Sequence, residues 1–326
     1  MNSLLSLSEV AHLIRDGIPL SLAGEESCLD QLPKGPWVGG TIPYFMSEEG
    51  GLKNKELVFV TRMPGNATVT FNYLPSDGLD ALVAGTPDNG YALAIVPAFS
   101  AAHASFAENC RDYEDAYVKP TIGWVAGMDL DNAGKQLPKV YDGTTGRKYA
   151  DGVVVAYVAL PEGQLASIEI VNMFEPDGLD VVRFPDGGFS ATECLVNGRP
   201  TQLAPYLVAR GNGDGKLPLV GDFAGAHANV SFQTIDQQSG HVMFYAPVFP
   251  DVEYWIAKPV ADYAGTLDSK LRETNDGNIA FSCNCILNYV YGELEGKKVG
   301  KLAGPITFGE IGYQLLNQTF VALRIE

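Results

Sequence analysis

The chain of 326 residues is 46% hydrophobic and 19% charged, so it can bury a large core, is long enough for two ordinary domains, and differs in composition from disordered proteins. Its formal net charge of −17 argues against nucleic acid or an anionic membrane as a partner, because phosphate binding needs runs of Lys or Arg and the 22 cations form none. Five irregularly spaced cysteines, no basic leader and no long apolar run predict reduced thiols and a cytoplasmic protein without membrane insertion.

The first predicted element is a helix within Leu5–Gly17. Ser6 suits its N-cap, and Glu9 three residues later completes a capping box. The glycine at the end of this range suits the C-terminal cap. Apolar residues at helical spacing, Val10 and Ile14 among them, predict the buried face of the helix.

Strand patterns dominate the rest of the chain. Residues 66–74 and 229–235 alternate apolar and polar side chains, which predicts strands with one buried face. Residues 92–96 and 153–160 are continuously apolar and predict central strands that are covered on both faces. The alternating side chains of residues 320–325 predict a strand with one apolar face that is available for contact with a partner chain. Further helices are expected at three places, which are Ser100–Tyr113, Pro200–Ala209 and Ala261–Thr274.

These patterns predict an α+β fold with mostly antiparallel or mixed sheets and more strand than helix. A buried strand pattern ends near Pro161, and a new one starts at Ile168. We therefore expect two domains, over residues 1–162 and 163–326.

The last fifth of the chain places polar side chains inside apolar stretches. The polar residues that stand out there are Ser282, Cys283, Glu310 and Asn317. Buried polar atoms need partners, so each of these side chains has either a structural bond or a ligand. For Glu310, between Gly309 and Gly312, both alternatives stand: backbone donors tie it down, or it receives an amino or hydroxyl group of a ligand.

Five segments in a fixed order carry a family resemblance through most of the chain. They are Trp37–Tyr44 (WVGGTIPY), Pro120–Leu130 (PTIGWVAGMDL), Val140–Ala156, Cys194–Thr201 (CLVNGRPT) with Tyr206, and the closing strings FSC, GEI and NQT between Phe281 and Thr319. Together they resemble the two halves of the FIST domain family (F-box and intracellular signal transduction). The sequence departs from the family pattern at residues 40–43 and 284–285, and the family's opening strand and helix are shortened here.

The resemblance implies two FIST-like halves and a role in sensing a small molecule. Family members commonly feed a fused output domain, whereas the FIST-like domain is expected to take up this entire chain. We therefore expect the protein to act alone or through a signalling partner in trans.

We expect a small-molecule pocket where the two halves meet. Its first wall is predicted from the glycine strands and the turn that follows them, namely Gly39, Gly40, Thr41, Gly123, Trp124 and Asp129. Its second wall is predicted from Ser282, Cys283, Glu310 and Asn317. The alternative for the glycines is tight packing between strands, and the alternative for Asp129 is a plain turn.

Neither a metal nor haem is expected as a cofactor. Cys283 and Cys285 point to the same face of a strand, but two ligands do not complete a metal site. The four histidines are scattered, and no CxxCH motif occurs. We expect both cysteines to be buried core thiols that react slowly.

The leading functional prediction is a cytoplasmic protein that senses or binds a small molecule without chemistry, because no nucleophile or acid–base pair can be named. The alternative is a self-assembling structural protein built on the same fold. Strand edges and the apolar face of residues 320–325 need cover, so a homo-oligomer is expected, and an open head-to-tail contact would give a filament.

Overall fold

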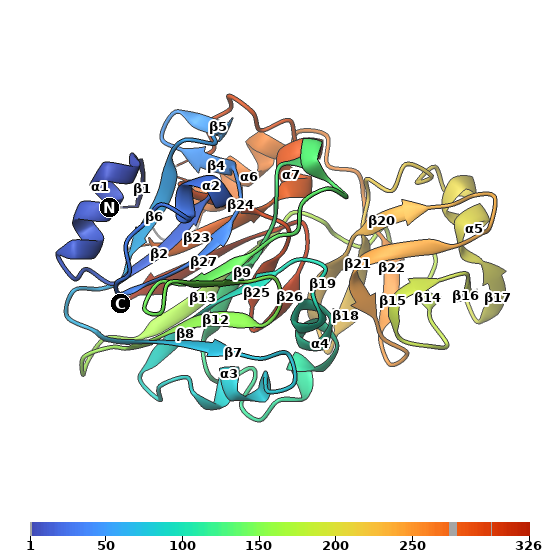
Figure 1. Cartoon of the computed structure of the whole chain (residues 1–326). Helices are drawn as coiled ribbons and strands as arrows, with labels where there is room; N and C mark the ends of the chain where they lie inside the picture. Colours follow the sequence, from blue (N-terminus) through green and yellow to red (C-terminus); the bar gives the residue numbers. More distant parts are fainter. Residues whose placement is uncertain (1, 274–278, 301) are drawn as a thin grey trace. The chain divides into compact units, whose positions relative to one another are not determined.

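The computed structural model describes residues 2–273, 279–300 and 302–326 (Figure 1). Strands take up 42% of the chain and helices 18%, in several mixed and antiparallel sheets, which confirms the predicted strand-rich α+β class.

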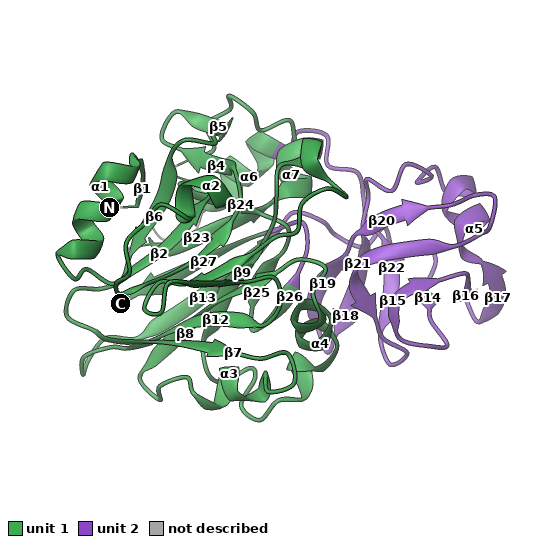
Figure 2. Ribbon diagram, viewed as in Figure 1, with its two compact units in different colours: residues 1–171, 264–315, 320–326 green, residues 172–263, 316–319 purple. Residues whose placement is uncertain are grey.

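The chain forms two compact units (Figure 2). Unit 1 holds Met1–Val171, Ala264–Leu315 and Phe320–Glu326, and unit 2 holds Asn172–Tyr263 and Leu316–Thr319. These units differ from the predicted halves 1–162 and 163–326, because strands near the end of the chain pair with strands near its beginning. Gly304 and Pro305, for example, pair with Met46 and Phe45.

The first sheet of unit 1 has the strand order β1-β6-β2-β3-β10-β11. Its strands are β1 (Ser3–Leu5), β2 (Leu20–Gly24), β3 (Trp37–Thr41), β6 (Val58–Arg62), β10 (Val140–Asp142) and β11 (Arg147–Tyr149), and the nearby helices are α1 (Leu7–Arg15) and α2 (Glu26–Leu29). Val10 and Ile14 of α1 join a buried cluster with Leu22 and Val60 of the sheet. The predicted capping box of α1 is confirmed, since the side chain of Ser6 accepts from a backbone N–H and the N3 glutamate bonds back to the cap.

The second sheet of unit 1 has the order β26-β25-β9-β8-β12-β7. Its strands are β7 (Thr68–Leu74), β8 (Gly90–Pro97), β9 (Thr121–Ala126), β12 (Val153–Ala159), β25 (Glu310–Gly312) and β26 (Gln314–Leu316), and its connections contain α3 (Asp80–Ala84), α4 (Ala101–Asn109), η1 (Cys110–Asp112) and η2 (Leu130–Asn132). As predicted, β8 and β12 are buried central strands, and β7 at the edge alternates exposed and partly buried side chains.

The third sheet of unit 1 has the order β13-β27-β23-β24-β4-β5. Its strands are β4 (Tyr44–Ser47), β5 (Gly50–Lys53), β13 (Ala166–Asn172), β23 (Ile279–Cys285), β24 (Gly304–Thr307) and β27 (Thr319–Ile325). The prediction that residues 320–325 leave an apolar face available is wrong. β27 lies between two other strands, and Phe320 to Leu323 are fully buried.

Two helices flank β23. α6 (Tyr263–Glu273) occupies the predicted range 261–274, whose last residue lies outside the described residues. α7 (Ile286–Tyr291) was not predicted, because six residues are too few to show a helical pattern.

Unit 2 contains two sheets, of order β17-β16-β14-β22-β18-β19 and β15-β21-β20. Its elements are β14 (Val182–Arg183), β15 (Gly188–Ala191), β16 (Glu193–Val196), β17 (Arg199–Gln202), α5 (Leu203–Ala209), β18 (Leu219–Phe223), β19 (Ala226–Val230), β20 (Phe232–Ile235), β21 (Val242–Val248) and β22 (Glu253–Ile256). The single strand predicted over 229–235 is two strands, which part at Ser231. The hydroxyl of this buried serine bonds to the side chain of Gln318 at 2.7 Å.

Two of the glycines expected at the site mark close packing. A Cβ on Gly123 would lie 1.9 Å from the carbonyl oxygen of Ala94 on the neighbouring strand β8. A Cβ on Gly40 would lie 2.8 Å from the ring of Trp124, which belongs to the second sheet. Side chains at either position would push their neighbours apart, so tight packing between strands and sheets accounts for both glycines.

Gly123→Ala is therefore expected to destabilise the protein by about 3 kcal/mol, because the added methyl group meets a backbone oxygen that cannot rotate away. The matched control is Gly65→Ala, where an added Cβ meets no atom within 4 Å, and its effect should stay below about 1 kcal/mol. Urea unfolding followed by circular dichroism measures both changes. Equal stability of the two variants would mean that β8 and β9 tolerate a wider spacing.

Candidate functional site

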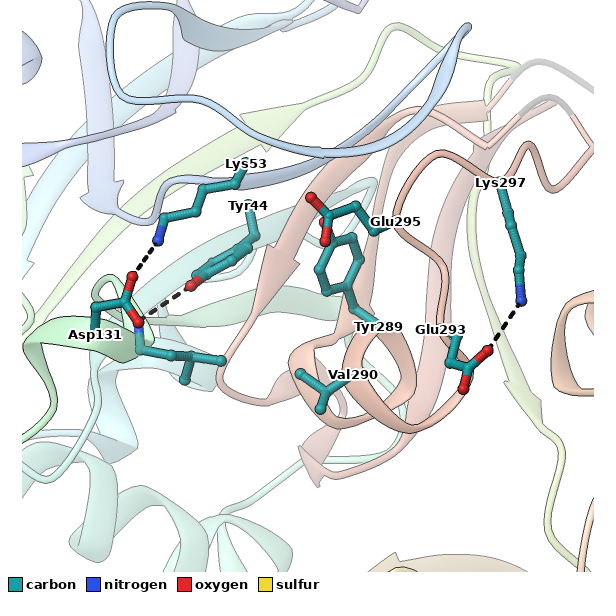
Figure 3. A pocket seen from close by; sticks show the side chains of 9 residues that line it. Tyr44, Lys53, Asp131, Tyr289, Val290, Glu293, Glu295 and Lys297 are labelled. Carbon is teal, nitrogen blue, oxygen red and sulfur yellow. Dashed lines mark hydrogen bonds and ion pairs between the residues drawn. The ribbon is translucent and has the colours of Figure 1, made fainter.

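A pocket of about 570 Å³ lies in unit 1 beyond the carboxyl ends of β9 and β23 (Figure 3). β8 and β9 are parallel, as are β23 and β24, and ligands in folds with parallel strands bind outside these carboxyl ends. The loop with η2 follows β9, and α7 follows β23. The pocket is lined by Tyr44, Lys53, Leu130, Asp131, Tyr289, Val290, Glu293, Glu295 and Lys297.

Asp129 anchors one wall of this pocket. Its side chain is 1% exposed, and its carboxylate accepts a hydrogen bond from the hydroxyl of Tyr44 at 3.1 Å. The ammonium group of Lys53 lies 2.6 Å from the same carboxylate, and that of Lys55 forms a second ion pair. The backbone N–H of Asp131 donates a further bond at 3.1 Å. One buried carboxylate thus ties the β4–β5 hairpin to the η2 loop.

These contacts fix the protonation states of Asp129, Tyr44, Lys53 and Lys55, which together form the Asp129 network. Burial alone would raise the pKa of Asp129, but hydrogen bonds from Lys53 and Lys55 outweigh it and hold the pKa well below its ordinary value. Hydrogen bonds to the two carboxylates raise the pKa of Lys53, and burial raises that of Tyr44. At neutral pH the aspartate is ionised, the lysines are charged and the tyrosine is neutral, so this network is suited to positioning and not to proton transfer.

Tyr289 forms the inner wall of the pocket and is 5% exposed. Its ring centroid lies 5.7 Å from that of Tyr44, with the ring planes tilted by 58°. The hydroxyl is buried and has no hydrogen-bond partner within residues 2–273, 279–300 and 302–326. Burial, with a smaller contribution from the charge of Glu295, raises the pKa of Tyr289 to about 12. The hydroxyl of Tyr289 is therefore neutral at pH 7.

The loop after α7 packs against β5 at two adjacent glycines, Gly50 and Gly51, which the sequence analysis missed. The carbonyl of Gly51 accepts from the N–H of Gly296 at 2.8 Å, and its N–H donates to Lys297 at 3.2 Å. A Cβ on Gly51 would lie 2.4 Å from the carbonyl oxygen of Leu294 and 2.8 Å from the Tyr289 ring. The Gly50-Gly51 pair can be seen in the sequence. The sequence does not show which distant loop packs against it.

Of the residues predicted from the sequence, Asp129 is the one whose contacts reach this pocket. Thr41 is structural, since its hydroxyl donates to the carbonyl of Gly127 at 2.7 Å. Trp124 is fully buried, and a Cβ on Gly39 would lie 2.8 Å from the carbonyl oxygen of Leu22.

The predicted residues of the C-terminal segment lie elsewhere, within their own units. In the core of unit 1, the thiol of Cys283 donates to the carbonyl of Gly123 at 3.5 Å, and Glu310 accepts from the hydroxyl of Thr307 at 3.4 Å. Ser282 bonds to a backbone carbonyl nearby, and Asn317 lies in unit 2. The structure does not bring these residues to the pocket.

Comparison with known proteins places the chain in one family. Residues 5–326 match the model of a family of unknown function, DUF6976. The chain belongs to this family. No curated protein matches it, and the FIST resemblance stays a prediction.

Within the described part of the chain, no helix has the length and apolar character needed to cross a membrane. Among the same residues, no three His, Cys, Asp or Glu side chains are grouped so that they could hold a metal ion.

The buried thiols give a direct test of the core. All five cysteines are buried thiols outside disulfides, and burial raises the pKa of Cys110 and Cys194 to about 11. Burial, with the charge of Glu310, also raises the pKa of Cys283. We expect Ellman's reagent to label almost no thiol in the native protein at pH 8 and all five after unfolding. Rapid labelling of Cys283 or Cys285 in the native state would contradict their burial.

The Asp129 network predicts a pH-dependent stability. The pKa of Asp129 is lower in the folded state, so its contribution is present above the ordinary value near 3.8 and is lost as the pH falls below it. Asp129→Asn should destabilise the protein by about 2 kcal/mol at pH 7, and this difference should shrink toward pH 2.

Asp131→Asn is the matched control, because that side chain is 83% exposed and contacts only Lys53 of the same network. It should change stability by less than about 0.5 kcal/mol at any pH. Denaturant unfolding of both variants from pH 2 to pH 7 measures the effect. A difference for Asp129→Asn that does not vary with pH would mean that the ion pairs do not stabilise the fold.

Proposed function

We propose that this protein binds a small molecule in the pocket between α7, the η2 loop and the β4–β5 hairpin, and that it serves as a cytoplasmic sensing or binding protein. The observation that carries the proposal is the hydroxyl of Tyr289, which is buried at the pocket wall without a partner in the described residues. A buried hydroxyl without a hydrogen bond costs about 1–3 kcal/mol, and a ligand that bonds to it recovers part of this.

The surroundings support binding more than catalysis. Every charged group of the Asp129 network already has a partner, and the tyrosines and lysines are protonated at neutral pH. The pocket volume, about 570 Å³, is in the range that holds small ligands. A sensing role agrees with the function that the resemblance to the FIST domain family implies. The self-assembly hypothesis loses one of its supports, because Phe320 to Leu323 are buried within the fold.

The proposal predicts that a simple aromatic alcohol binds at this place. Benzyl alcohol can pack on Tyr44 and Tyr289 and bond to the free hydroxyl, so it should bind weakly, with a millimolar dissociation constant, in protein-detected NMR titrations. Tyr289→Phe should weaken binding about five-fold, which corresponds to one hydrogen bond, with no loss of stability. Tyr157→Phe, whose hydroxyl donates to Ala81 at 2.9 Å outside the pocket, controls for tyrosine removal in general.

A second variant tests the location of binding. Val290 is 43% exposed at the pocket wall, so Val290→Trp should fill the pocket and abolish binding without disturbing the core. Val118→Trp places the same side chain at a site that is 75% exposed and does not line the pocket. Binding that survives Val290→Trp unchanged would refute the proposed site.

A further inference from the structure

The charged side chains that line the pocket differ in whether they form ion pairs with other described residues. Its lining carries the two ammonium groups of Lys53 and Lys297 and three carboxylates. Lys53 is already bound to Asp129 at 2.6 Å and to Asp131 at 2.8 Å. Lys297 lies 3.7 Å from Glu293. Glu295, by contrast, forms no ion pair with any residue that the structure describes.

We propose that the pocket selects a small organic cation, an amine with an aromatic or apolar body, over neutral and anionic molecules of the same shape. This inference rests on the proposed function and names the class of its ligand. It has two bases, which are the carboxylate of Glu295 and the hydroxyl of Tyr289, on a side chain that is 5% exposed. Among the residues that the structure describes, the carboxylate forms no ion pair and the hydroxyl has no hydrogen-bond partner.

These two groups are placed to share one ammonium group. Figure 3 shows the Tyr289 ring rising from α7 toward Glu295, and the charge of Glu295 acts on that hydroxyl. The hydroxyl can donate its proton to the carboxylate and accept an N–H from the ligand. Glu295 is exposed, so its side chain can turn to admit the ammonium group. The rings of Tyr44 and Tyr289 then supply aromatic faces for the body of the ligand.

An anion finds little to bind in the same place. The nine lining residues include no arginine, which is the side chain best suited to carboxylate or phosphate. The charge of Lys53 is shared between two aspartates and is not available without breaking the network that holds the wall. The net charge of −17 on the whole chain also attracts cations and repels anions at long range.

The test uses three probes of nearly equal shape, which are benzylammonium, benzyl alcohol and benzoate, titrated into the full-length protein at pH 7 and followed by NMR. We expect benzylammonium to bind about ten-fold more tightly than benzyl alcohol, and benzoate to bind more weakly than both. Because the added attraction is electrostatic, raising the salt concentration should narrow the gap between the amine and the alcohol.

Glu295→Gln should reduce the ten-fold preference to less than about two-fold while leaving the affinity for benzyl alcohol unchanged. Glu293→Gln is the matched control, because that carboxylate is 85% exposed and already faces Lys297, and it should keep most of the preference.

The outcomes separate the two proposals. Equal binding of the amine and the alcohol, or a preference that survives Glu295→Gln, overturns the cation inference and leaves the proposed binding function intact. Failure of all three probes to bind overturns the proposed function itself.

Discussion

The arrangement of the candidate site depends on one buried carboxylate. Asp129 is 1% exposed, and a buried charge is stable only when it is paired and hydrogen-bonded. Lys53 and Lys55 are 30% and 48% exposed, so they neutralise the aspartate while their ammonium groups keep much of their hydration. The desolvation penalty therefore falls mainly on one group. Because the desolvation penalty is limited in this way, a buried charge can join the β4–β5 hairpin to the η2 loop. This junction between the hairpin and the loop forms one wall of the pocket.

Because every charged group of the Asp129 network is paired, the proposed recognition of a ligand falls to the opposite wall. α7 and the loop after it supply Tyr289, Val290 and the carboxylates of the rim, and this loop reaches its place because Gly51 has no side chain. The same backbone bonds that hold the loop against β5 also bring it over the Tyr289 ring. Rigid support on one side and an exposed, charged loop on the other is an arrangement that suits binding with local adjustment.

The parts of the fold that the sequence predicted are those that depend on local chemistry. Ser6 and Glu9 cap a helix through contacts between residues three positions apart. The apolar run at 153–160 must be buried, and this holds whichever segments of the chain cover it. The strand at 320–325 was misread because its alternation does not show which strands lie beside it, and β13, with Glu169 that pairs with Arg324 at 2.7 Å, is far away in sequence. The site was only partly predictable for the same reason. Asp129 follows a recognisable glycine-rich strand, but nothing local to Tyr289 or Gly51 shows that they meet.

The turn that ends α7 places two acidic residues on the rim of the pocket. Glu293 has φ of +50°, a left-handed conformation that costs a non-glycine residue about 1–2 kcal/mol and that is usually filled by glycine at this point of a helix end. The N–H of Leu294 then bonds back to the carbonyl of Tyr289 at 2.9 Å, and Leu294 is fully buried. With that leucine anchored, the residues on either side, Glu293 and Glu295, both face the pocket. A glycine at 293 would relieve the backbone and remove one carboxylate from the rim, so the carboxylate of Glu293 is present there at the expense of backbone strain.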